Sequence, residues 1–490
     1  MNPFEIRNLA VKFLIIFSAI FLSVFLLISV ISTDRNQLSS LIEFSGYFLF
    51  PIAVFFPRMG FIILLIISGY LDFSKRLMVF FGDIGWLDVI DVLKLSPICL
   101  SGLFLGLIFR RWMEGSFFSK IEWRFALFIA GYSLVTFVSY YFQIKNLFST
   151  IAVSTNGFVY CFLILIVSML KNEIKIKNIA VLLVCIYIPC ACYGIFQFLF
   201  GIADFEYKFF SLGVTTQRLY IYDTFHRAFG TLSTPGAYST TMVVFFVLTL
   251  GLVLDEMKKT FSLVPRLFYV SSCGLFFIAT ITSLNRTAWA GAIIGIFAVI
   301  FFQSKYRTIT FYSIISFLFL MIVLNASWLL LHMDDAQKLL PTGNNTKEAA
   351  FRLGTYGDRL VGFKNLTTNP KFWTLFGDKE ILQSQMEGDK GENFSHDAVS
   401  TMLARYGIVG LILGTVLLFL SLYKTHEKLL SLKKDRDFNL LIACVSAPVV
   451  IIILGVFSGY YLSTFPINLL FWLLISLLLR RIYVERSCDV

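Results

Sequence analysis

His396 is the most informative titratable side chain in the sequence, and it stands in the stretch ENFSHDAVSTMLARYGIVGLILG. Ser395 can cap a helix that begins here, and the apolar residues that follow carry the chain into a membrane. The imidazole is then fixed at a lipid–water boundary. Because imidazole titrates near neutral pH, it can take a proton from a sugar hydroxyl as that hydroxyl attacks an anomeric carbon. A polar anchor at the membrane surface is the alternative role.

Arg286 is the second residue whose position favours chemistry, because it lies in SLNRTAWAG between two apolar runs with almost no polar linker. A guanidinium at a membrane boundary is costly unless it is paired or functional. Its planar, permanently charged fork suits phosphate oxygens and could hold a pyrophosphate as it departs. Snorkelling to the surface from a helix end is the alternative. The further arginines expected on the same side are Arg218, Arg227, Arg352 and Arg359.

Metal and cofactor sites are not indicated. Asp334 and Asp335 form an acidic pair in a loop, which is more typical of solvated surface than of a metal site. The eight cysteines show neither a disulfide framework nor zinc spacing, and all but Cys488 lie inside apolar runs. The net charge of +11 has no soluble basic domain around it that would hold nucleic acid. We therefore expect the lipid bilayer as the partner of the basic residues, with no nucleic acid, metal or cofactor.

Composition shows which elements must position these side chains. Of the 490 residues, 58% are hydrophobic and only 14% are charged, which is too apolar for a water-soluble protein of this length. The charges cluster between apolar runs, as they do when hydrocarbon excludes them and loops collect them. The chain is therefore expected to be an integral membrane protein.

The apolar runs predict an all-α, polytopic membrane bundle of about 12–14 transmembrane helices. Two short runs, Ile42–Phe56 and Met59–Leu71, are separated only by Pro57 and Arg58, so a re-entrant or tilted pair would give the lower number. The predicted spans are Ala10–Ile31, Ile42–Phe56, Met59–Leu71, Leu95–Phe109, Arg124–Tyr141, Leu147–Leu170, Ile179–Phe200, Ala237–Leu254, Phe268–Ser283, Ala288–Phe302, Ile309–Leu331, Tyr406–Leu422, Asn439–Tyr460 and Phe465–Leu479.

Basic residues in the short loops orient this bundle with both termini in the cytoplasm. Residues 1–331 then form the first part of the transmembrane bundle, with an external segment near 201–236. Residues 332–398 form a large external loop that contains short helices, and residues 399–490 form the C-terminal transmembrane helices. Both external segments are too long to be mere connectors, so function is expected there.

Three stretches resemble the bacterial O-antigen polymerase and O-antigen ligase superfamily. FHRAFGTLSTPGAYSTTM is similar to the family's Arg–x–x–Gly–Thr segment, and its matching positions are Arg227, Gly230, Thr231 and Pro235. TSLNRTAWAGAIIGI is similar to the Ser–Arg motif that opens a helix and places Arg286 on its arginine. In the loop, RLVGFKNLTTNPKFWTLFGD and HDAVSTMLARYGIVGLIL are similar to the family's Arg-led and His-led segments, with Arg359, Asn369, Pro370, Gly377 and His396.

The resemblance implies a GT-C-like glycosyltransferase of the bacterial inner membrane, with a periplasmic late loop. It would act without a metal on undecaprenyl-diphosphate-linked glycans at the periplasmic face. His396 would deprotonate the acceptor hydroxyl, and Arg286 and Arg359 would hold the diphosphate. The residues expected to contact substrate beside them are Arg227, Arg218, Arg352, Asp397 and Arg405.

Several functions remain open at this point. A polymerase transfers the growing chain onto a lipid-linked repeat unit, and a ligase transfers the finished chain onto lipid A–core; we favour the polymerase because both external segments are sizeable. A chain-length-regulating partner is left open. A flippase or transporter for lipid-linked sugars would show interrupted spans and related halves, which the sequence does not clearly show. A non-catalytic scaffold would leave His396 replaceable.

Overall fold

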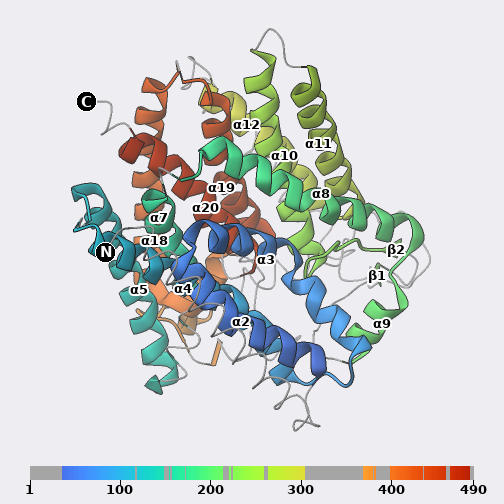
Figure 1. Cartoon of the computed structure of the whole chain (residues 1–490). Coiled ribbons are helices and arrows are strands. Elements are labelled where there is room, and N and C mark those ends of the chain that lie inside the picture. The colour runs from blue at the N-terminus through green and yellow to red at the C-terminus, as the bar shows by residue number, and fades with distance from the viewer. Residues whose placement is uncertain are drawn as a thin grey trace.

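The structure is a computed structural model, and it describes residues 36–115, 118–147, 150, 154, 157–170, 173–212, 220–221, 225–258, 263–303, 368–378, 380–381, 398–433, 435–458 and 464–485. The predicted spans Ala10–Ile31 and Ile309–Leu331 lie outside these residues. The described chain is a helical bundle (Figure 1), and one antiparallel pair of short strands, β1 (Tyr220–Ile221) and β2 (Phe225–His226), lies beside it.

The helices follow the apolar runs. The α-helices are α2 (Gln37–Phe55), α3 (Pro57–Leu77), α4 (Trp86–Met113), α5 (Lys120–Ile144), α7 (Leu163–Met169), α8 (Ile176–Phe200), α9 (Asp204–Ser211), α10 (Pro235–Met257), α11 (Leu263–Thr282), α12 (Arg286–Gln303), α18 (Ala398–Ser431), α19 (Phe438–Ser458) and α20 (Ile467–Leu479). Short turns of tighter or wider helix are η1 (Met78–Phe80), η2 (Val159–Phe162), η3 (Pro370–Trp373) and η5 (Arg480–Glu485).

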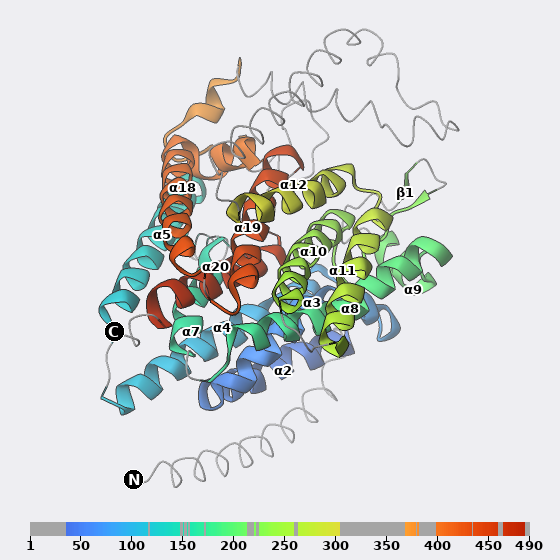
Figure 2. The same cartoon turned by 90° about the horizontal axis from the view of Figure 1, so that it is seen from above.

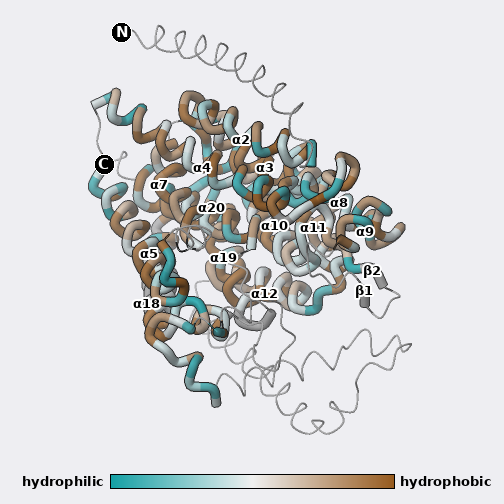
Figure 3. The backbone as a smooth tube through the Cα atoms, turned by 90° about the horizontal axis from the view of Figure 1, so that it is seen from below, coloured by the Kyte–Doolittle hydropathy of each residue, from teal (hydrophilic) through white to brown (hydrophobic). Residues whose placement is uncertain are grey.

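Length and composition identify the membrane-crossing helices. Within the described residues, nine helices are long and apolar enough to cross a membrane. Hydrophobic residues predominate along these helices (Figure 3). The prediction of a helical, multi-pass membrane protein is therefore confirmed.

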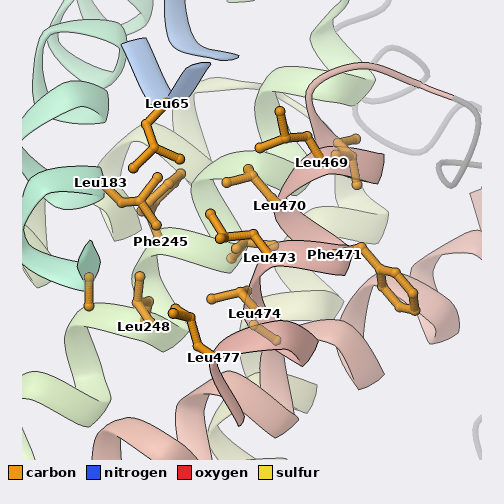
Figure 4. Close-up of a cluster of buried hydrophobic side chains, with 14 of the residues drawn as sticks. Leu65, Leu183, Phe245, Leu248, Leu469, Leu470, Phe471, Leu473, Leu474 and Leu477 are labelled. Atoms are coloured by element: carbon orange, nitrogen blue, oxygen red, sulfur yellow. The ribbon is translucent and has the colours of Figure 1, made fainter. Parts of the chain in front are cut away.

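The core of the bundle forms around α10, which packs against α8, α11, α12 and α19. The apolar window of α10 is 89% buried, whereas that of α2 is only 17% buried, so α10 is central and α2 is peripheral. Leu65, Leu183, Phe245 and Leu248 face a row of leucines on α20 in this core (Figure 4). The apolar surface left on the outer helices is what a lipid-facing helix presents.

Hydrogen bonds tie the helices together at two opposite ends of the bundle. At one end, which we call the site end, α3, α8 and α11 end and α10 and α12 begin; Thr231 donates to the Gly69 carbonyl there at 2.6 Å. At the opposite end, Asp255 of α10 accepts from the backbone N–H groups of Asn439 and Leu440 at 3.0 and 2.8 Å. Asp255 thereby satisfies the first free donors of α19.

Two predicted spans differ from the structure. The run Leu147–Leu170 is not one continuous helix, because Phe158 leaves helical geometry (φ −122°) before η2 and α7. The span predicted from Tyr406 begins earlier, at Ala398, and is kinked at Gly407. The first turns of this helix were missed because Ser400 and Thr401 are polar, although both side chains are buried.

Candidate functional site

The stretch from Arg227 to Pro235 is a fixed turn that leads into α10. Ala228 and Phe229 are fully buried. Gly230 has φ +54°, and a Cβ there would lie 2.7 Å from the Cys190 carbonyl oxygen, so only glycine fits. Thr234 accepts from the Ala237 N–H at 2.8 Å and caps α10, whose first residue is Pro235. The local sequence therefore determines this turn.

A buried ion pair holds the middle of the turn. Arg76, near the end of α3, pairs through Nη1 with Glu206 of α9 and donates from Nη2 to the Gly230 carbonyl at 2.8 Å. The Arg76 side chain is only 2% exposed and that of Glu206 is fully buried. The guanidinium carbon lies 4.7 Å from the ring centroid of Phe229 and 5.3 Å from that of Phe73. Three elements thus meet on one side chain.

Gln197 of α8 completes this network. Its Oε1 accepts from the N–H groups of Phe229 and Gly230 at 3.1 and 2.8 Å. Its Nε2 donates to both carboxylate oxygens of Glu206 at 3.1 and 3.0 Å. The opposite orientation of the amide would set donor against donor, so the hydrogen bonds determine which way Gln197 points. We call Arg76, Gln197 and Glu206 the buried network.

Burial opposes the ionisation of Glu206. Burial raises the pKa of its carboxyl above the ordinary value, while the Arg76 guanidinium and the Gln197 amide act to lower it. Because folding raises this pKa, stability from this group is present at low pH and is lost as pH rises through the folded-state value. The ion pair therefore specifies a geometry more than it stabilises the fold.

Arg286 stands at the start of α12, beside the start of α10. Asn285 donates from Nδ2 to the Ser239 hydroxyl of α10 at 2.8 Å and accepts from the Thr287 hydroxyl at 2.7 Å. These bonds fix the α11–α12 turn against α10. Arg286 is half-buried and is the first residue of α12. Its guanidinium charge and the partial positive charge of the helix N-terminus both favour an anion at this position.

The segment that carries Asn369, Pro370 and Gly377 packs on the start of α18. Asn369 caps η3 by accepting from the Lys371 N–H at 3.0 Å. Farther along, Ile408 donates to the Thr374 carbonyl at 3.0 Å, and Asp378 donates to the Ala404 carbonyl at 3.1 Å. These bonds hold residues 374–378 against the helix that begins two residues after His396.

Gln143 and two glycines make this close approach possible. Gln143, near the end of α5, donates from Nε2 to the carbonyls of Phe376 and Arg405 at 2.8 and 2.7 Å. Gly377 and Gly407 have φ of +87° and +64°. A Cβ at Gly407 would overlap the Leu375 backbone. We call Gln143, Gly377 and Gly407 the loop junction; α5 and α18 lie side by side there (Figure 2).

The described residues include three of the predicted site residues. Arg227 precedes the turn into α10 and Arg286 opens α12, so both flank the start of α10 at the site end. Arg405 lies beside the loop junction, where its carbonyl accepts from Gln143. The other predicted site residues lie outside the described residues; they are His396, Arg359, Arg218, Arg352 and Asp397.

Sequence reasoning missed the buried network and, in the loop junction, Gln143 and Gly407; it named Gly377 as a motif position. The available signals were a charged side chain just after one apolar run, Arg76, and an amide side chain within another, Gln197. Within the described ranges, no group of three His, Cys, Asp or Glu side chains could hold a metal ion.

No protein-family model matches the chain, and no curated protein and no solved structure matches it. The resemblance to O-antigen polymerases and ligases therefore depends on the sequence motifs alone.

Proposed function

We propose that the chain is a GT-C-like glycosyltransferase that polymerises undecaprenyl-diphosphate-linked glycans at the periplasmic face of the bacterial inner membrane. The observation that carries the proposal is the position of Arg286 at the N-terminus of α12, held through Asn285 and Ser239 against the start of α10. A permanently charged fork at a helix N-terminus and a membrane boundary suits a lipid-linked diphosphate. The Arg227 turn flanks the same helix start.

In the proposed reaction, an acceptor sugar hydroxyl attacks the anomeric carbon of the lipid-linked glycan. The bond from that carbon to the phosphate oxygen breaks, and the new glycosidic bond forms. His396 takes the hydroxyl proton, and undecaprenyl diphosphate leaves with both bonding electrons. Arg286 and Arg359 stabilise the charge that develops on the diphosphate, and Arg227 assists them. The chemistry needs no cofactor and no metal.

The distribution of basic residues supports a periplasmic site end. Basic residues of the short loops lie at the opposite end. Arg111 of α4 pairs there with Glu122 of α5, and Lys177 of α8 pairs with Glu256 of α10. Arg480 and Arg481 follow α20 at that same end. Under the positive-inside rule that end faces the cytoplasm, so the site end faces outward.

An in vitro assay with purified protein in lipid vesicles and lipid-linked repeat units tests the function. We expect His396→Ala to lower the transfer rate by about 10²–10⁴-fold, because the acceptor hydroxyl loses its base. The matched control is His426→Ala, late in α18, which should leave the rate unchanged. The wild-type rate should survive thorough chelation.

Full transfer by His396→Ala would refute the assignment of the base. Polymer formation on lipid-linked acceptors is the expected product. Transfer to lipid A–core alone would identify a ligase, and translocation of the lipid without any new glycosidic bond would identify a transporter.

A further inference from the structure

The buried network joins α3, α8 and α9 to the backbone of a motif turn. Arg76 reaches the Gly230 carbonyl, and Gln197 reaches the Phe229 and Gly230 N–H groups. Three polar groups of the turn backbone, two N–H groups and one carbonyl, are therefore held by side chains from two other helices. The residue pair Arg76 and Glu206 is separated by 130 positions, so the contact depends on the complete fold.

Only an arginine can make all these contacts at once. One Nη group pairs with Glu206 and the other donates to Gly230, while the guanidinium carbon lies 4.7 Å from the centroid of the Phe229 ring. A lysine ammonium is a single point charge, so it can keep the ion pair but cannot also hold the carbonyl and stack on the ring. The geometry of the turn therefore depends on the shape of this side chain as well as on its charge.

A buried ion pair is weak support for the stability of a fold, because desolvating two charges offsets most of their attraction. A buried polar network instead restricts the structure to one arrangement, and in this network every buried side-chain polar atom except Arg76 Nε has a partner within the described residues. What this network fixes is the turn that begins at Arg227, three residues before Gly230. A shift of about 1 Å at a substrate contact can cost about 10²-fold in rate.

We infer that Arg76, with Glu206 and Gln197, is a positioning residue that sets the Arg227 side chain for the diphosphate of the lipid-linked substrate. This inference rests on the proposed function. Arg76 itself is buried and touches no substrate; it acts through the turn.

A double-mutant cycle on transfer kinetics separates positioning from general stabilisation. Alone, Arg76→Lys should lower kcat/KM by about tenfold to 10²-fold. In the Arg227→Ala background the same substitution should change kcat/KM by less than about threefold, because the side chain through which Arg76 acts is gone. Equal losses in both backgrounds would overturn the inference.

The matched control is Arg480→Lys. Arg480 is also only 2% exposed at the side chain and also pairs with a glutamate, Glu485, but it lies at the opposite end of the bundle. We expect this substitution to leave kcat/KM within about twofold of wild type. A loss that matched that of Arg76→Lys would show that any buried arginine matters equally, and it would contradict the positioning role.

Hydrogen exchange of the turn gives a readout that needs no activity. Gln197→Leu removes the acceptor of the Phe229 and Gly230 N–H groups without adding a charge, and Arg76→Lys removes the donor to the Gly230 carbonyl. Both variants should speed exchange in residues 225–236 by about tenfold or more, with α19 unchanged. Unchanged exchange in the turn would overturn the inference. If exchange responds as expected while wild type transfers no glycan, the proposed function fails and the control of the turn by the buried network stands.

Discussion

Arg76 and Arg286 have the same side chain but stand in different surroundings at the site end of the bundle. Arg76 is enclosed by Glu206, the Gly230 carbonyl and two aromatic rings. Arg286 is half-buried at the start of a helix, where a ligand can approach it. An enclosed side chain is typical of a structural cation, and a partly exposed one at a helix N-terminus is typical of a cation that binds an anion.

Substitution of Arg286 tests whether it binds diphosphate or only snorkels. We expect Arg286→Ala to lower kcat by about 10²–10³-fold, because a preorganised donor to the leaving group is lost. Arg286→Lys keeps the charge but not the two-pronged geometry, so it should recover only part of the rate. Steady-state kinetics with lipid-linked repeat units measure both. A lysine variant as active as wild type would show that charge at the helix end is sufficient.

The sequence indicated Arg286 but not Arg76. An arginine between two apolar runs can be recognised in the sequence, because a charged residue is rare next to membrane-spanning segments. Arg76 is one of several charges after an apolar run, and its partner is 130 residues away. Nothing local distinguishes such a pair from solvated loop charges. Only the packing of α3 against α9 identifies it.

At the scale of elements, the loop junction fixes the contact of residues 374–378 with α5 and with the start of α18. Gly407 has φ +64° and ψ −166°, a conformation that is essentially restricted to glycine. The kink turns the first residues of α18 so that the carbonyls of Ala404 and Arg405 face Asp378 and Gln143. In a straight α18, those carbonyls would accept from N–H groups of the same helix and could not bond to Asp378 and Gln143.

Gly407→Ala should therefore detach residues 368–378 from α18 and destabilise this region by about 1–3 kcal/mol. Faster hydrogen exchange in 368–378 and a lower transfer rate are the expected results. Gly131→Ala in α5 is the control, since a Cβ there meets nothing within 4 Å. An alanine at 407 that left both exchange and transfer unchanged would show that the kink is dispensable.

Apolar runs predicted most elements closely. The span predicted as Ile179–Phe200 is α8, Ile176–Phe200, and the span predicted as Ala237–Leu254 is α10, Pro235–Met257. The pattern did not predict the kink at Gly407, because a glycine followed by apolar residues looks the same in a straight helix. The periodicity of a sequence reports which residues are apolar, whereas a kink is set by contacts with another segment.

At the scale of the whole molecule, the two ends of the bundle differ in what they carry. The site end holds the buried network, Arg286 and the loop junction. The opposite end holds paired basic residues and the Asp255 cap of α19. The proposed reaction requires that the site end face the periplasm.

Cysteine labelling in spheroplasts tests this orientation. Lys208 of α9 is exposed at the site end and Lys258 after α10 is exposed at the opposite end. In a Cys488→Ser background, Lys208→Cys should react with a membrane-impermeant maleimide in intact spheroplasts. Lys258→Cys should react only after lysis, because its end of the bundle faces the cytoplasm. The reverse pattern would place Arg227 and Arg286 in the cytoplasm and would contradict the periplasmic reaction.

The separation between Arg76 and Glu206 also has a consequence for how the chain is made. The two residues are 130 positions apart, so at ~5–20 residues per second the ribosome adds Glu206 roughly 6 to 26 seconds after Arg76. During that interval the guanidinium lacks the Glu206 carboxylate and has only Asp72 of its own helix as an acidic neighbour. The last step in seating α3 therefore belongs to a nascent chain that already extends beyond α9.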